Sequence, residues 1–263
     1  MEHCEGHLAL VTGASSGIGL CFCRELARRG CNLVMVSNQQ CLGQCAADVA
    51  AEYGVEAYPF FCDLTADDCA VQILGFLDSQ SLEPDYLINN AGIFSFREVT
   101  ATEPAKVRCF IDLHVRAVTE LSRAFAIRFA KRGSGRILNM SSMSCWMPMP
   151  GIALYSATKA YIRVFSRALH YELRDSGVSV TVACPGGIAT DLFGLPENLK
   201  RLAVNIGVLT RPETFARKAI DRMLRGKKQY INGMLNRFSI FFVAIMPTRV
   251  RMLVKHRLLD RMS

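Results

Sequence analysis

Three side chains in the middle of the sequence are of types that can move a proton: Ser142, Tyr155 and Lys159. Tyr155 and Lys159 are four residues apart, so in a helix they lie on one face, about one turn apart. A tyrosine with a pKa near 10 is a poor acid or base at neutral pH, and lowering that pKa to about 7 requires roughly 4 kcal/mol. One ammonium group about 4.5 Å away supplies about 3.7 kcal/mol at an effective dielectric constant near 20. The spacing therefore predicts a proton-transferring tyrosine assisted by a lysine, although the pair alone could also be an exposed contact on an ordinary helix.

A glycine-rich turn, residues 12–19 with the sequence TGASSGIG, follows an apolar run and leads directly into a helical pattern. Glycines let the backbone turn tightly and approach a pyrophosphate, and a helix N-terminus offers free N–H groups at the positive end of its dipole. Many strand-to-helix turns contain glycine, but a place after the first strand of a βαβ unit favours a phosphate-binding site.

The elements that must position these groups alternate between short apolar runs and longer segments of helical period. We predict strands at Leu8–Thr12, Asn32–Val36, Ala57–Phe61, Tyr86–Asn89, Gly135–Met140 and Val178–Ala183. We predict helices at Gly17–Arg29, Leu42–Tyr53, Asp67–Asp78, Glu103–Arg132, Ala153–Ser176 and Pro212–Gly226. This alternation indicates an α/β fold, a doubly wound, mostly parallel sheet of the Rossmann type in three αβα layers, with ligands bound at the carboxyl ends of the strands.

The composition fits a globular chain with a large core, because 263 residues with 51% hydrophobic and 21% charged side chains exclude a wholly disordered, collagen-like or coiled-coil protein. No internal repeat or linker divides it, so residues 1–263 are predicted to form a single domain. The eleven cysteines are an odd number without zinc-site spacing, which predicts a reducing, cytoplasmic location and no metal site. Residues 200–263 carry 15 basic and 3 acidic side chains, and positive charge confined to one region argues against nucleic acid as a partner.

Further motifs extend this pattern. After the turn come Asn89–Asn90–Ala91–Gly92, then Ser142, then Tyr155–Ser156–Ala157–Thr158–Lys159, and finally Pro185–Gly186. Together with the G-x-x-x-G-x-G spacing they resemble, in the same order, the motifs of the short-chain dehydrogenase/reductase family. The resemblance implies a Rossmann-type enzyme that transfers a hydride between a nicotinamide and a carbonyl carbon, with Tyr155 as acid in reduction or base in oxidation and Ser142 donating a hydrogen bond to the substrate oxygen.

The resemblance also implies a cofactor site. Its residues are Gly13, Ser15, Ser16, Gly17, Ile18 and Gly19 at the phosphates, Asp63 and Leu64 at the adenine, Asn90, Ala91 and Gly92 at the central strand and the ribose, Tyr155 and Lys159, and Pro185, Gly186, Ile188 and Thr190 at the nicotinamide. Ser37 and Asn38, at the end of the predicted second strand, join these candidates because they can hydrogen-bond a phosphate. Without the resemblance, Asp63–Leu64–Thr65 would be interpreted as a loop and helix cap. The predicted second strand ends in Val36–Ser37–Asn38 without an acid to repel a 2′-phosphate, which favours NADP(H) over NAD(H), although no arginine stands there either.

One position departs from the family pattern. His114 falls where the family usually has an asparagine that helps to hold a water molecule next to the lysine. A histidine can also hold water and relay protons, so we include His114 among the candidate catalytic residues. The alternative is a histidine that is simply packed or bridged by solvent.

The segment between Ser142 and Tyr155 holds three methionines and the only tryptophan. Matching family segments border the substrate, so we expect a substrate site of Ser142, Met143, Trp146, Met149 and Tyr155, with Phe193 from a flap and helix at 191–226; plain core packing is the alternative. These apolar walls predict a hydrophobic ketone or alcohol, steroid-like or lipid-like, as substrate. The alternatives are a reductase of long-chain 3-oxoacyl or 3-keto sphingoid lipids at a membrane surface and, from another class, a non-catalytic NADPH sensor or scaffold.

The C-terminal extension, residues 237–263, is apolar at first and then basic. Its nine-residue apolar run, 238–246, would span about 14 Å as a helix against a bilayer core of about 30 Å, so it cannot cross as a simple helix. Basic residues interleaved with aliphatic ones predict peripheral contact with an anionic membrane, the alternative being packing on the same or a partner subunit. The family resemblance predicts a homodimer or homotetramer formed through the long helices at 103–132 and 153–176.

Overall fold

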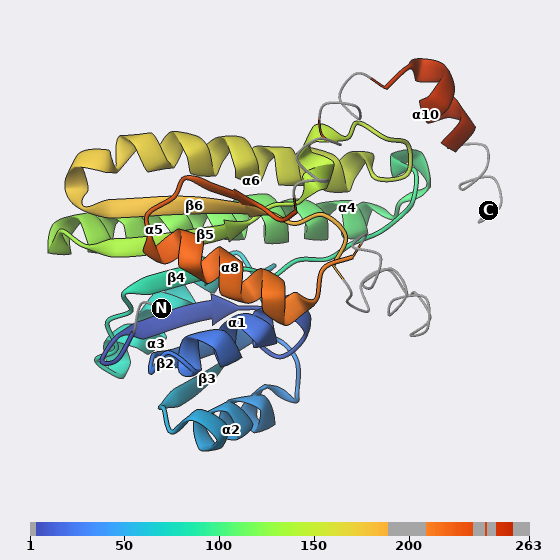
Figure 1. The fold of residues 1–263 in the computed structure, drawn as a ribbon. Helices are drawn as coiled ribbons and strands as arrows, with labels where there is room; N and C mark the ends of the chain where they lie inside the picture. Colours follow the sequence, from blue (N-terminus) through green and yellow to red (C-terminus); the bar gives the residue numbers. More distant parts are fainter. Residues whose placement is uncertain (1–3, 189–208, 234–239, 241–245, 255–263) are drawn as a thin grey trace.

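The computed structural model describes residues 4–188, 209–233, 240 and 246–254. These residues form a parallel sheet with the strand order β3-β2-β1-β4-β5-β6-β7 (Figure 1). The strands are β1 (Leu8–Thr12), β2 (Asn32–Ser37), β3 (Ala57–Phe61), β4 (Tyr86–Asn89), β5 (Gly135–Met140), β6 (Val178–Cys184) and β7 (Gln229–Ile231). The chain reverses its direction of winding between β1 and β4, so the carboxyl ends of these two strands border a crevice.

Helices cover both faces of the sheet, which confirms the three-layer α/β prediction. They are α1 (Gly17–Ala27), α2 (Leu42–Tyr53), α3 (Cys69–Ser79), α4 (Pro104–Ile111), α5 (Ala117–Arg132), α6 (Ala153–Glu172), α8 (Pro212–Leu224) and α10 (Thr248–Val254). Alternate strand residues supply the two cores: Ala9 and Val11 pack with α1, α2 and α8, whereas Leu8 and Leu10 pack with α3 and α5. Strand β1, with the sequence LALVT, is almost wholly apolar because both of its faces are buried.

Most element boundaries lie within two or three residues of the predictions. The helix predicted to end at Ser176 ends earlier, with α6 stopping at Glu172 and a 3-10 turn following at Arg174–Ser176. The seventh strand, β7, was not predicted. It has three residues and pairs with β6 alone among the described strands, so its sequence carries too little periodic pattern to mark it.

The helix predicted at Glu103–Arg132 is interrupted. A π-helical turn, η2 (Asp112–Arg116), joins α4 to α5. Such a turn inserts an extra residue into the helix and changes the direction in which the following side chains point. Here it turns His114 inward, where it is fully buried, and sets Arg116 beside the segment that follows β3. The turn therefore lies between the two halves of the site described below.

A buried polar network joins the sheet to α5 and α6. The Asn89 side-chain amide donates to Asn139 Oδ1 at 2.9 Å and to Ser122 Oγ at 3.1 Å, and Asn139 Nδ2 donates to Ser166 Oγ at 2.9 Å. All four residues are at most 3% exposed. Because unpaired polar groups are costly in a core, this network fixes the two helices relative to β4 and β5.

Among the described residues, no helix combines the length and apolar character needed to span a bilayer. From the predicted C-terminal extension, the structure describes residues 240 and 246–254. Figure 1 shows α10 at the periphery, apart from the helices that cover the sheet. Val250, Met252 and Leu253 on this helix are between 40% and 49% exposed.

Candidate active site

A cavity of about 440 Å³ lies at the carboxyl edge of the sheet. Every cofactor candidate within the described residues lines it, and so does Ser142, whereas Thr190 lies outside the described residues. The lining also contains residues that the sequence analysis did not select, namely Gln39, Cys62, Thr65, Ile93, Cys109, Leu113, Met140 and Ser141. The parallel sheet thus collects residues from six strand ends, β1 to β6, into one cavity.

The glycine turn keeps its shape for steric reasons. Gly13 and Gly17 have φ angles of +64° and +53°, which side chains rarely adopt. A Cβ added at Gly19 would lie 1.9 Å from the carbonyl oxygen of Gly13, so α1 can begin this close to the turn only without a side chain. Around Gly17 nothing lies within 4 Å of an added Cβ, which leaves space before the helix N-terminus. This open N-terminus is suited to a phosphate.

Asn90 and Thr12 hold the turn against β4. The Asn90 side chain donates to the carbonyl oxygens of Thr12 at 3.0 Å and Gly13 at 3.3 Å. In return, Thr12 Oγ1 accepts the backbone N–H groups of Asn90 at 3.0 Å and Ala91 at 3.1 Å. These bonds tie the first strand to the fourth across the crevice, so Asn90 shapes the glycine turn from outside it.

The ribose end of the cavity is polar and uncharged. The hydroxyl groups of Ser15 and Ser37 are 2.9 Å apart, and Ser37 Oγ accepts the backbone N–H of Gln39 at 3.2 Å. Asn38 lies beside them in the lining. Among the described lining residues the charged side chains are Asp63 and Lys159, and Ser37 is followed along the chain by the uncharged Asn38 and Gln39.

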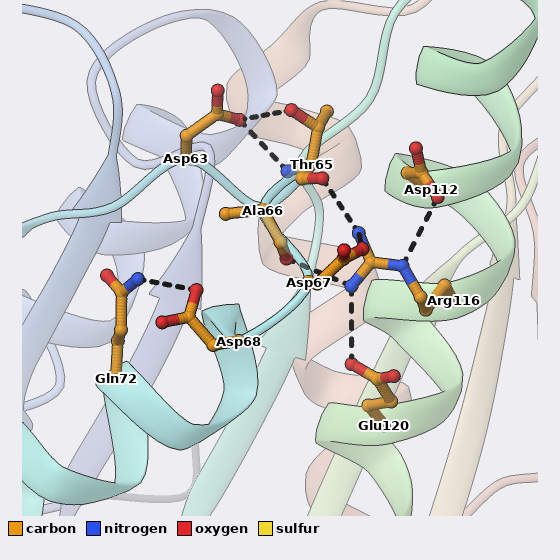
Figure 2. Close-up of polar contacts among 9 residues, drawn as sticks. All are labelled: Asp63, Thr65, Ala66, Asp67, Asp68, Gln72, Asp112, Arg116 and Glu120. Atoms are coloured by element: carbon orange, nitrogen blue, oxygen red, sulfur yellow. Dashed lines mark hydrogen bonds and ion pairs between the residues drawn. The ribbon is translucent and has the colours of Figure 1, made fainter.

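The segment after β3 forms the wall predicted for adenine. Asp63 Oδ1 accepts hydrogen bonds from the backbone N–H and the hydroxyl of Thr65, both at 2.9 Å (Figure 2). This bonding is the loop that the sequence alone indicates, but Asp63 is not the helix cap, because α3 begins later with Asp68 at its N-cap position. Asp63 and Thr65 also line the cavity. The loop and binding interpretations of Asp63 are therefore compatible.

Tyr155 and Lys159 lie on one face of α6, as their spacing predicts, and both are buried. The expectation of a lowered tyrosine pKa is wrong for this structure. Burial raises the pKa of Tyr155, outweighing a hydrogen bond with Ser142 that acts in the other direction. Lys159 Nζ lies 5.7 Å from the tyrosine ring centre and donates to the carbonyl oxygen of Met140 at 3.0 Å. Burial lowers the pKa of Lys159 from 10.5 to about 8, so its ammonium form still predominates at neutral pH.

His114 has partners on both ring nitrogens. Its Nε2 accepts the backbone N–H of Ile93 at 3.0 Å, and its Nδ1 lies 3.0 Å from Thr158 Oγ1. Because Thr158 donates its hydroxyl proton to the carbonyl oxygen of Tyr155, Nδ1 must carry the proton in this network. Burial, followed by the charge of Lys159, holds the pKa of His114 well below 6.5. The geometry is that of the packed alternative: a neutral imidazole that joins Ile93 to helix α6.

Asn232 was missed by sequence reasoning and supports the predicted nicotinamide end. It follows β7, is 2% exposed, and accepts the backbone N–H of Gly186 at 2.6 Å. Its Nδ2 donates to Thr210 Oγ1 at 2.9 Å, and Thr210 N in turn donates to the carbonyl of Gly187. A lone asparagine after an unpredicted strand gives no recognisable signal, because its partners lie 22 and 46 residues away.

The substrate candidates separate into two groups. Ser142 and Tyr155 line the cavity, whereas Met143, Trp146 and Met149 are absent from its described lining. Trp146 packs against the apolar cluster at α5, α6 and β6, with the Arg163 guanidinium 4.4 Å from its ring centre. Phe193 lies outside the described residues. Instead, Phe94 packs edge-on against Tyr155 with ring centres 5.0 Å apart, and Ile93, Cys109 and Leu113 line the cavity.

These features fit a nicotinamide dinucleotide. An open helix N-terminus, a polar uncharged ribose end and the loop at Asp63 are arranged along one cavity that ends at Tyr155 and Lys159. A proton donor and a buried cation at one end, with phosphate-type binding groups at the other, are the parts required for nicotinamide-dependent oxidation and reduction.

Comparison with known proteins agrees with this chemistry. The family model described as short chain dehydrogenase matches residues 7–197. The chain is 32% identical over 250 residues to a very-long-chain 3-oxoacyl-CoA reductase of Anas platyrhynchos, covering 92% of this chain and 77% of that protein.

Two solved structures are also similar. A short-chain dehydrogenase from Sphingobium yanoikuyae in complex with NADPH is 28% identical, with a TM-score of 0.78 over 96% of this chain and 97% of that one. A 7beta-hydroxysteroid dehydrogenase structure is 26% identical, with a TM-score of 0.83 over 94% and 95%. Since the family match covers more than half of the sequence and the fold agrees, the chain belongs to the short-chain dehydrogenase family of oxidoreductases.

Proposed function

We propose that this oxidoreductase interconverts a ketone and a secondary alcohol on a hydrophobic, lipid-like substrate, with a long-chain 3-oxoacyl thioester as the first candidate. The observation that carries the proposal is the buried Tyr155, which shares a cavity with Ser142 and Lys159 and has an apolar ring packed against it. The name of the relative from Anas platyrhynchos supports the 3-oxoacyl class, and the hydroxysteroid dehydrogenase supports a steroid ketone as the second candidate.

In the proposed reduction, Tyr155 gives its phenolic proton to the substrate oxygen as the ketone becomes an alcohol. Its raised pKa keeps it protonated at neutral pH, which is the state that a proton donor needs. The ammonium group of Lys159 favours the phenolate left behind, and the Ser142 hydroxyl donates a hydrogen bond to the substrate oxygen. A bound reduced nicotinamide supplies the hydride. Oxidation of an alcohol uses the same groups in reverse.

The described walls near Tyr155 favour an apolar substrate. Ile93 and Leu113 line the cavity, and Phe94 covers one side of the tyrosine ring. These residues take the place of Met143, Trp146 and Met149 in the substrate site that we propose. Apolar side chains offer no partner to the hydroxyl groups of a small sugar-like substrate, which would lose hydrogen bonds to water on entry.

We also propose NADPH as the preferred cofactor. Ser37, Asn38 and Gln39 at the end of β2 line the cavity and are uncharged, so this strand end carries no acid that would repel a 2′-phosphate. The NADPH complex of the Sphingobium yanoikuyae enzyme supports this choice. The preference is tested by calorimetric Kd values for NADPH and NADH on the same preparation. A lower Kd for NADPH is expected, and equal values would remove the preference.

The activity is tested by NADPH consumption with long-chain 3-oxoacyl-CoA, a steroid ketone, a 3-keto sphingoid base and a small ketone. Turnover on one lipophilic class is expected, with a loss of about 10²- to 10⁴-fold in Tyr155→Phe. Tyr161→Phe is the matched control, because Tyr161 is on the same helix but bonds to Thr119 and is partly exposed. Silence on every substrate with intact NADPH binding would favour the sensor or scaffold hypothesis.

Further proposals concern the location of the enzyme and its contact with a membrane. We propose that the protein is cytoplasmic. We also propose that its helix α10 contacts an anionic membrane, because Val250, Met252 and Leu253 are exposed beside Arg249. Co-sedimentation with phosphatidylserine vesicles at low salt tests this contact, and a protein that stays in the supernatant would rule the contact out.

We propose that the protein forms a homo-oligomer through α5 and α6, where Ile127 and Val164 are 55% and 62% exposed. Light scattering of the wild type and of Val164→Glu tests that state, and a monomeric wild type would contradict it.

A further inference from the structure

Arg116 lies outside the cavity yet reaches the backbone of its wall. It ends the π-helical turn η2, and its guanidinium points toward the segment that follows β3 (Figure 2). Nη2 donates to the carbonyl oxygen of Thr65 at 2.8 Å, and Nη1 donates to that of Ala66 at 2.9 Å. The planar guanidinium thus binds two successive carbonyl groups 50 residues away, a geometry suited to arginine and not to lysine.

Acidic side chains hold the guanidinium in this direction. Asp112 Oδ1 accepts from Nε at 3.2 Å, and carboxylate oxygens of Glu120 and Asp67 lie 3.6 and 3.7 Å from the terminal nitrogens. Asp112 and Glu120 are one turn before and after Arg116 on the same helical stretch. The Arg116 side chain is 21% exposed, so these charge-assisted bonds are partly shielded from solvent.

One of the carbonyl groups that Arg116 binds belongs to Thr65, a residue of the cavity wall, and the other belongs to the next residue, Ala66. Asp63, Leu64 and Thr65 line the cavity, and the Asp63 carboxylate closes a tight turn onto Thr65. One anchor of this turn is therefore internal, through Asp63, and the other is external, through Arg116. The segment lies beyond the paired residues of β3, so its conformation depends on these bonds together with two backbone hydrogen bonds, from Ala66 N–H to the carbonyl oxygen of Asp63 at 3.1 Å and from Cys69 N–H to that of Ala66 at 3.2 Å.

We propose that Arg116 is a positioning residue that holds Asp63–Ala66 in the conformation that receives the adenosine half of the dinucleotide. It does not touch the cofactor and acts through the backbone of Thr65 and Ala66. The inference depends on the dinucleotide site of the family fold and not on the identity of the substrate. If loss of the anchor lowers the binding-competent fraction of the segment to about a tenth, the apparent Kd rises about ten-fold.

The test is the affinity of Arg116→Met for NADPH and for two fragments, measured by calorimetry. We expect the Kd for NADPH and for adenosine 2′,5′-bisphosphate to rise by the same factor, about ten-fold, while reduced nicotinamide mononucleotide binds as it does to the wild type. Arg116→Lys keeps the charge but loses the planar pair of bonds, so it should restore only part of the affinity. An unchanged Kd for the adenosine fragment would overturn the proposal.

Arg128→Met is the matched control. Arg128 is on α5, binds both carboxylate oxygens of Asp78 on α3 at 2.7 and 2.9 Å, and is absent from the described cavity lining. It should lower stability without changing the affinity for the adenosine fragment. Equal weakening in both arginine variants would mean general loosening and would also overturn the proposal. If Arg116→Met does not fold, Asp112→Asn, which removes the carboxylate that aims Nε, should raise the same two Kd values about two- to three-fold.

Discussion

The two ends of the cavity are built from different materials. At the glycine turn and the segment after β3, the shape comes from backbone: positive φ angles, a missing Cβ at Gly19, and carbonyl groups held by Asn90 and Arg116. At the other end the shape comes from buried side chains, with Tyr155 and Lys159 at 9% and 4% exposure and both pKa values shifted.

This contrast separates two kinds of sensitivity. Where backbone makes the site, added volume or the loss of a hydrogen bond that holds the backbone does harm. Where buried side chains make it, removal of one charge changes the chemistry while the fold keeps its shape, or even becomes more stable, because a buried cation is costly. The comparison would fail if removal of a buried charge near Tyr155 left the chemistry unchanged, or if added volume at the glycine turn left stability and cofactor affinity unchanged.

The largest effect is expected from Lys159→Met. Loss of the ammonium group removes the stabilisation of the phenolate on Tyr155, so turnover should fall about 10²- to 10⁴-fold. Steady-state kcat at saturating NADPH measures this effect, and the Kd for NADPH reports whether the cavity survives. Turnover within two-fold of the wild type would exclude Lys159 from the chemistry.

The same variant should be more stable than the wild type near neutral pH. The Lys159 pKa is about 8 in the folded protein and near 10.5 when unfolded, so between these values the unfolded chain binds more protons. The free energy of unfolding of the wild type should therefore rise with pH across that window, by roughly 2–3 kcal/mol relative to that of Lys159→Met. This gain is lost again as the pH falls from 10.5 through 8. Urea unfolding of both proteins at pH 7 and 10 compares them. If the free energy of unfolding changed with pH by the same amount in both proteins, the buried Lys159 cation would not be costly.

At the other end, Gly19→Ala should destabilise by about 1–3 kcal/mol or more, because its Cβ would collide with the carbonyl oxygen of Gly13. NADPH affinity should fall with it. The control is Gly75→Ala on α3, where an added Cβ meets nothing within 4 Å. That exchange should stabilise by about 0.5–1 kcal/mol through helix propensity. Thermal unfolding measures the stability of both variants, and an equal change in stability in the two would exclude the steric explanation.

His114→Asn tests the connection between the ends. With both ring nitrogens bonded and a low pKa, His114 stays neutral, so the kcat–pH profile should keep its shape while kcat falls about ten-fold from loss of the Ile93 contact. Because the folded-state pKa lies below 6.5, wild-type stability should decline as pH falls below 6.5, and the variant should lose less there. A kcat–pH profile that changes shape would instead indicate that His114 relays protons.

Much of this site was predictable because a parallel sheet brings the residues after its strands to one edge. Gly13, Asn90, Ser142 and Pro185 each follow an apolar run, so their positions along the chain are enough to place them at one cavity. The four-residue spacing of Tyr155 and Lys159 likewise fixes their common helix face. These features depend on local periodicity, which a sequence records directly.

Tertiary structure decided what local periodicity does not record. The long-range hydrogen-bond partners of Arg116, Asn232 and His114 lie between 21 and 51 residues away, and these contacts depend on a π-helical turn and a three-residue strand. The pKa of Tyr155 also rises rather than falls, because burial outweighs the opposing hydrogen bond with Ser142. Residue types and spacing determined which chemistry this chain contains, whereas packing determined the protonation and alignment of its groups, since desolvation and long-range hydrogen bonds exist only in the folded molecule.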